Sequence, residues 1–113
     1  MIEIILQDYL ISKLSVPVVL EVPKPVPASY VLLDKTGSRR ENGIDTATFA
    51  IQSVAPTLYE AAELNEQVKG FMERLPWEAP SVFKAALNTD GNFTNTKTKE
   101  RRYQAVYHIT YKE

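Results

Sequence analysis

The chain has 113 residues, a formal net charge of −1 and no cysteine. Its length fits a single domain, residues 1–113, and 44% hydrophobic with 24% charged residues is typical of a globular protein rather than a disordered one. A charge near zero disfavours a protein that works mainly by binding nucleic acid or an anionic membrane, and the lack of cysteine excludes disulfides, thiol nucleophiles and cysteine metal sites.

The N-terminal segment, MIEIILQD, carries acids where a signal peptide would carry basic residues. No apolar run approaches the ~18–20 residues needed to span a membrane. We therefore expect a soluble, cytosolic protein with no membrane partner.

One helix and three strands are predicted in the first half of the chain. Apolar residues recur at helical spacing over residues 2–14, which predicts an amphipathic helix. Residues 16–22 are rich in valine and bounded by prolines, which predicts an edge strand because proline lacks the amide hydrogen that a central strand needs. Strands are also predicted over 30–36 and 44–55, and the polar segment 37–43 between them is predicted to be a loop ending in an Asn-Gly turn.

A second helix is predicted over residues 57–75. Thr57 and Glu60 form a capping box at its start, and Pro76 is expected to end it. Gly70 inside this helix costs about 1 kcal/mol relative to alanine, and we expect close packing around it as compensation.

The last two strands are predicted over residues 82–87 and 102–111. A polar loop, 88–101, separates them and contains an expected turn at Asp90-Gly91. Short links imply a mainly antiparallel sheet. The predicted fold is α+β, with about four to five strands, two helices packed on the sheet and the order α-β-β-β-α-β-β.

Groups able to do chemistry are scarce. His108 is the only histidine, and it falls on a strand face opposite Tyr103, Tyr107 and Tyr111, which favours a surface or interface role over a general base. The tyrosines fit a core better than a base-stacking platform. The serines lack nucleophile-elbow glycines, the four glycines form no phosphate loop, and acids early in the second helix suit its dipole better than a metal. We predict no enzyme, no cofactor and no metal.

Two kinds of surface remain as candidates for contacts with other molecules. One face of the strand 44–55, with Thr46, Thr48 and Gln52, is uncharged. It is therefore less polar than a fully solvated strand face usually is. Basic side chains also gather in the two predicted loops. One interpretation is that these side chains are solvated charges with no further role. The other is that they contact a partner protein or face DNA inside an assembly. These basic residues are Arg39, Arg40, Lys97, Lys99 and Arg101.

Five segments together are similar to a known family. They are VPVVLEVP from residue 16, YVLLDKTGS from residue 30, IDTATFAIQ from residue 44, APTLYEAAEL from residue 55 and RYQAVY from residue 102. In order and spacing they resemble the small tail-terminator or tail-completion proteins encoded among the head–tail genes of long-tailed bacteriophages and prophages. The resemblance covers most of the chain and is one of pattern, because the family has no catalytic signature.

The resemblance implies an α+β structural subunit, made in the bacterial host cytoplasm, that enters the virion. It implies a homo-oligomeric ring, usually a hexamer, at the head-proximal end of the tail. Such a ring caps the tail tube protein and joins it to the head-completion or connector proteins, with at most passive contact with DNA in its lumen. The candidate subunit interface is then Val19 on the edge strand, or the face with Thr46, Thr48 and Gln52. Loops 37–43 and 88–101 would face the lumen or the partners.

Three alternatives stay open. A head-completion or adaptor protein on the portal side would have a similar sequence. A monomeric nucleic-acid-binding module would use the basic loops and would bind less tightly as salt rises. A small enzyme is disfavoured by the missing nucleophile and metal constellations.

Overall fold

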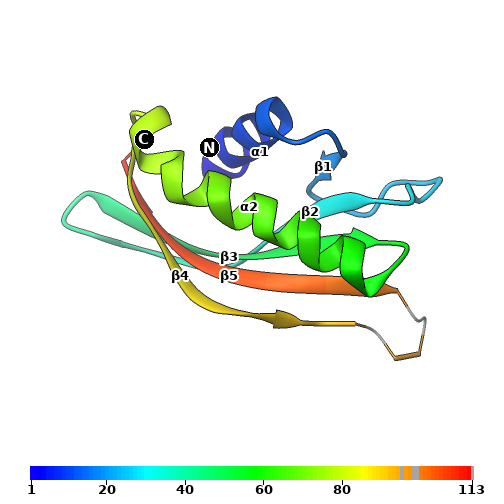
Figure 1. Ribbon diagram of the computed structural model, residues 1–113. Coiled ribbons are helices and arrows are strands. Elements are labelled where there is room, and N and C mark those ends of the chain that lie inside the picture. Colours follow the sequence, from blue (N-terminus) through cyan, green and yellow to red (C-terminus); the bar gives the residue numbers. More distant parts are fainter. Residues whose placement is uncertain (95, 98–99, 113) are drawn as a thin grey trace.

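The computed structural model describes residues 1–94, 96–97 and 100–112. Five strands form one sheet in the order β1-β2-β3-β5-β4, in which β1 runs parallel to β2 and every other pair is antiparallel. The α+β class and the chain order predicted from the sequence are confirmed (Figure 1). The elements are α1 (Ile2–Lys13), β1 (Val18–Val19), β2 (Tyr30–Glu41), β3 (Ile44–Ala55), α2 (Leu58–Glu78), β4 (Val82–Asn92) and β5 (Arg101–Tyr111).

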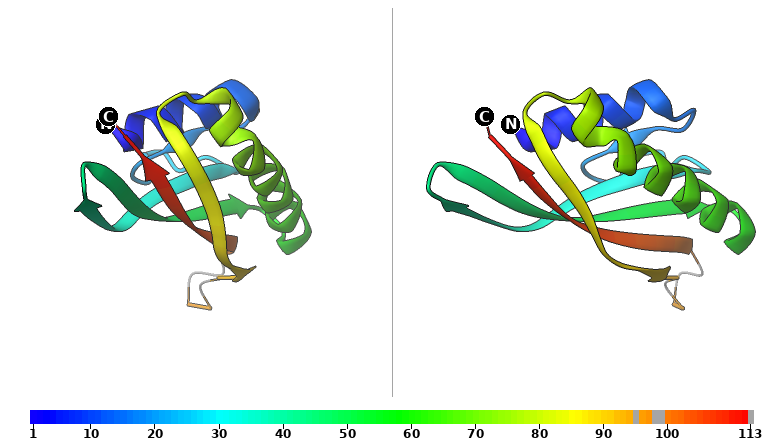
Figure 2. Two further views of the ribbon diagram at one scale, coloured as in Figure 1. Left: turned by 90° about the vertical axis from the view of Figure 1, so that its left-hand side faces the viewer. Right: turned by 60° about the vertical axis from the view of Figure 1, so that its left-hand side comes forward.

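Both helices lie on the same face of the sheet (Figures 1 and 2). Helix α2 crosses β3, β5 and β4, while α1 covers β1 and β2. Phe49 and Ile51 of β3 are fully buried under α2, together with Tyr107 and Ile109 of β5. Burial of these side chains is the main driving force for the fold. Because both helices lie on one face, the opposite face of the sheet has no helix. Neither helix is long and apolar enough, within the described residues, to cross a membrane.

Two predicted loops are partly strand, although the Asn-Gly turn predicted at the end of the first is confirmed. Residues 37–41 continue β2, and the connection to β3 consists of Asn42 and Gly43, with φ of 53° and 77°. Residues 88–92 continue β4, so Asp90-Gly91 pairs with β5 instead of forming a turn. Polar side chains predicted loops here, but backbone pairing with a neighbouring strand tolerates exposed polar residues.

The first strand is shorter than predicted. Only Val18 and Val19 pair with β2, in parallel, and the amide of Val31 also donates to the carbonyl of Pro17. The prolines that follow limit further pairing because they supply no amide hydrogen.

Helix α2 is longer than predicted, since it continues past Pro76 to Glu78. A proline removes one helical hydrogen bond, and this loss is tolerated in the last turn, where the amide of Ala79 still bonds to the carbonyl of Leu75 at 2.8 Å. The start of α2 is as predicted, because the amide of Glu60 donates to the hydroxyl of Thr57.

The two helices meet at a polar contact. The hydroxyl of Tyr9 lies 2.7 Å from the carbonyl oxygen of Phe71 and 2.9 Å from a carboxylate oxygen of Glu78. Lys13 bonds to the other carboxylate oxygen at 2.7 Å. Burial and the Glu78 carboxylate raise the pKa of Tyr9 to about 12, while Lys13 and Tyr9 lower the pKa of Glu78. This contact fixes the position of α1 beside α2.

Candidate functional site

The face of the sheet that carries no helix, called the open face below, is uncharged at its centre. Because side chains alternate along a strand, burial of Phe49 and Ile51 under α2 turns their neighbours the other way. The antiparallel register brings residues of β3 and β5 side by side on this face. The central residues are Thr46, Thr48, Ala50, Gln52, Gln104, Val106, His108 and Thr110.

Hydrogen bonds fix several side chains of the open face. The Thr48 hydroxyl lies 3.0 Å from Nδ1 of His108, and the amide of Gln52 donates to the side-chain oxygen of Gln104 at 3.0 Å. Arg102 donates to Gln52 and to Glu100. The face is therefore ordered within the single chain, and a partner that bound there would meet a surface of defined shape.

Cations border one end of the open face. A hollow of about 530 Å³ lies there, lined by Arg39, Thr46, Thr48, His108 and Thr110 together with Gly37 and Ser38. The register places Arg39 opposite Thr46, Thr46 opposite Thr110, and Thr110 opposite Lys84. Arg39 and Lys84 thus lie at the two edges of one band across the sheet, with hydroxyl groups between them.

The predicted interface residues fall in two places. Thr46, Thr48 and Gln52 all belong to the open face, but Gln52 is only 9% exposed and is held by its hydrogen bonds. Val19 is half-buried at the end of β1, on the far edge of the sheet. The structure does not bring Val19 together with the other three.

The predicted basic loops are not a single group. Arg39 and Arg40 lie within β2 and turn to opposite faces, so their assignment to a loop was wrong. Arg39 lines the hollow on the open face, whereas Arg40 donates to both carboxylate oxygens of Asp45, at 2.7 and 2.9 Å. These bonds lower the pKa of Asp45. Arg40 therefore has an ordinary structural partner within the hairpin.

The second group of basic residues lies at the start of β5. Lys97 is exposed in the connection before the strand, Arg101 is exposed at the first position of β5, and Lys99 lies outside the described residues. The hypothesis that they contact a partner stays a prediction.

A polar cluster between α2 and β4 was missed by the sequence analysis. The carboxylate of Asp90 accepts from the side-chain amide of Asn65 at 2.7 Å and from Lys69 at 2.5 Å. Burial alone would raise the pKa of Asp90, but these two bonds lower it below its usual value. Asn65 is 1% exposed, so Asp90 supplies a partner that a buried amide needs. The signal in the sequence was an asparagine on the apolar side of α2.

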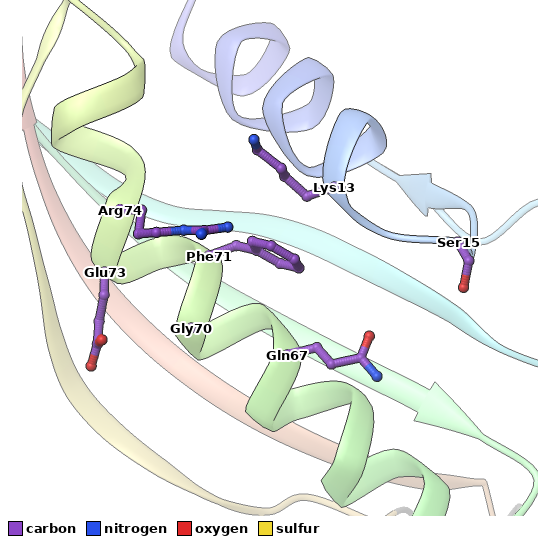
Figure 3. A pocket seen from close by; sticks show the side chains of 7 residues that line it. All are labelled: Lys13, Ser15, Gln67, Gly70, Phe71, Glu73 and Arg74. Atoms are coloured by element: carbon purple, nitrogen blue, oxygen red, sulfur yellow. The ribbon is translucent and has the colours of Figure 1, made fainter.

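A second hollow, of about 500 Å³, lies between the end of α1 and the outer side of α2 (Figure 3). Lys13 and Arg74 line it, and the Arg74 guanidinium sits 5.1 Å from the centre of the Phe71 ring. Gly70 lies on the same surface, and a Cβ built there would meet no atom within 4 Å. The close packing expected around Gly70 is therefore absent within the chain.

No group of three or more His, Cys, Asp or Glu in the described part of the chain is arranged to hold a metal ion. Comparisons with protein-family models and with curated proteins find no match for this chain. The open face, with its band of hydroxyl groups and bordering cations, is the surface on which a function can be argued.

Proposed function

We propose that the protein is a structural assembly subunit of the tail-terminator type, which joins copies of itself into a ring. The open face carries this proposal. A sheet with helices on one side leaves its other side to water or to a partner, and a water-facing sheet surface is polar. Here the centre of the face holds hydroxyl, amide, imidazole and aliphatic groups, several of them 9% exposed or less, such as Ala50 and Gln52.

The resemblance supplies the kind of assembly. In that family a ring, usually a hexamer, ends the tail tube and meets the head connector, and it needs subunit contacts rather than catalytic groups. Contacts between unlike surfaces of identical subunits close into a ring when the rotation between neighbours allows it. A single small subunit with an ordered, uncharged sheet face fits this requirement.

Thr48→Glu is expected to abolish ring formation while leaving the fold intact. Thr48 is half-exposed at the centre of the open face, so a carboxylate there is tolerated in water but becomes an unpaired buried charge in a subunit contact. Light scattering and negative-stain imaging measure the loss of the ring, and circular dichroism confirms the fold.

Val19→Asp tests the other candidate surface, and Lys112→Glu is a control on an exposed residue after β5. Loss of the ring with Val19→Asp, but not with Thr48→Glu, would move the interface to the β1 edge. A ring that survives both substitutions would contradict the proposed interface.

A binding experiment separates the tail-terminator role from the portal-side alternative. Purified tail tubes and filled heads are each offered the wild-type protein. We expect the protein to bind the tube end and to block further addition of tube subunits. Binding to filled heads alone would instead assign the protein to head completion.

A further inference from the structure

The outer side of α2 carries a regular stripe of exposed residues. Exposed positions recur at alternating intervals of four and three residues, which places them on one line along a helix. Tyr59 is 76% exposed at one end and Trp77 is 89% exposed at the other. Aromatic side chains are enriched at interaction surfaces relative to the rest of a protein surface. We call these residues the α2 stripe: Tyr59, Glu63, Glu66, Gly70, Glu73 and Trp77.

The α2 stripe is acidic between its aromatic ends. Glu63, Glu66 and Glu73 supply three carboxylates. Lys69 bonds to Glu66 as well as to Asp90, so it offsets one of these carboxylates, and Glu63 and Glu73 are the two left to attract a partner. Gly70 leaves the middle of the stripe without a side chain, and no group of the same chain fills that space (Figure 3).

The open face has the opposite charge pattern. Arg39 and Lys84 border its hollow, while Arg102 lies at its other end, bound to Glu100. Asp34 and Glu41 are acids of the same face, at the β2 positions opposite Ala50 and Ile44. The hydroxyl-lined centre beside Arg39 and Lys84 therefore suits a surface that brings carboxylates.

The two surfaces cannot meet within one chain. The α2 stripe runs for about 27 Å at 1.5 Å per residue, and the open face runs for about 20 Å from Thr46 to Gln52 at 3.4 Å per residue. Helix α2 lies on the far side of the sheet from the open face (Figure 2). Contact between them therefore requires a second copy of the chain.

We infer that the α2 stripe of one copy packs on the open face of the next. Each sheet then gains a helical cover on its second side, and Gly70 lets the helix backbone approach the sheet closely. Because the two surfaces differ, the contact is head-to-tail, and such contacts close into a ring when the rotation between neighbours allows it. This inference rests on the proposed function and specifies the contact that the ring would use.

Charge reversal tests this pairing. Glu63→Lys with Glu73→Lys reverses the stripe, and Arg39→Glu with Lys84→Glu reverses the face. Each double variant alone is expected to be monomeric by light scattering, since like charges then meet at every contact. An equimolar mixture is expected to regain the ring, because each reversed surface finds its complement on the other variant. Asp8→Lys with Glu21→Lys changes the charge by the same amount as the stripe variant, away from both surfaces, and is expected to assemble like wild type.

A crosslinking experiment gives a second readout that does not depend on charge. The chain has no cysteine, so Glu66→Cys and Thr48→Cys placed together in one chain are its only thiols. A short bis-maleimide is expected to link chains into a ladder up to the size of the ring. The pair Asp8→Cys and Thr48→Cys is expected to give no ladder.

The outcomes separate this inference from the proposed function. If both double variants still form a ring, or if their mixture does not reassemble, the pairing of stripe and face is wrong. The proposal that the wild-type protein forms a ring is then unaffected. A wild-type protein that stays monomeric at its highest attainable concentration, and gives no crosslinked ladder, overturns both.

Discussion

Replacing Phe49 by alanine is expected to lower the free energy of unfolding by about 3–5 kcal/mol, because it removes a fully buried aromatic ring and leaves a cavity. Phe49 lies near the middle of the central strand β3, within the core under α2. Urea denaturation followed by circular dichroism measures the change.

The matched control is Thr46→Ala, three residues away on the open face of the same strand. We expect this change to cost less than about 1 kcal/mol, since no core contact is lost. If the two substitutions cost the same, the open face would already be packed in the single chain and would not be available to a partner.

Asp90→Ala is expected to cost about 1–3 kcal/mol, the usual penalty for leaving a buried polar group without its partner. The substitution removes the acceptor of the Asn65 amide, which is 1% exposed, and one of the two carboxylates bound to Lys69. Asp34→Ala removes an exposed acid from β2 and is the control, expected to change stability by less than about 0.5 kcal/mol. A loss no larger than that of the control would show that α2 and β4 do not depend on this cluster.

The same cluster predicts a dependence on pH. The pKa of Asp90 is lowered in the folded chain, so its contribution is complete above the ordinary aspartate value of about 3.9. The contribution is lost as the pH falls through the lowered folded value, because the protonated carboxyl no longer holds Lys69. Wild type is therefore expected to lose more stability on acidification than Asp90→Asn. Equal slopes of unfolding free energy against pH would contradict this.

Much of the fold was predictable because it rests on periodic burial. The alternation in β3 correctly placed Phe49 and Ile51 in the core and Thr46 and Thr48 on the other face. Tyr107 and Tyr111 were correctly assigned to the core, with His108 exposed opposite them, whereas Tyr103 is only half-buried and lies outside the core. A strand that buries one face shows its period in the sequence, whatever its neighbours are.

The errors occurred where long-range contacts decide the local structure. Asp90-Gly91 has the composition of a turn, but Asp90 bonds to Asn65 and Lys69 of α2 and its backbone pairs with β5. Pairing with β3 likewise draws Arg39 and Arg40 into β2 and separates them onto opposite faces. Neither contact can be read from the residues alone, because each partner lies on another element.

The candidate site was predictable only in part. Thr46 and Thr48 could be placed on an uncharged face because that face alternates with the core. Arg39 and Lys84 could be placed beside this face only from the register of four strands, which no single segment of the sequence reveals. The α2 stripe was present in the sequence as a regular spacing, but its exposure became meaningful only when the core beneath the helix was known.

The turn formed by Asn42 and Gly43 ends a hairpin that projects beyond α2 (Figure 1). Every residue from Asp34 to Ile44 is exposed, yet the two strands stay paired up to Glu41 and Ile44. A loop that becomes ordered only on binding pays a cost in conformational entropy, which weakens the contact. Here the ladder and the tight turn fix the shape beforehand. The hairpin therefore keeps its shape in the single chain, and a contact made by its tip would cost little conformational entropy.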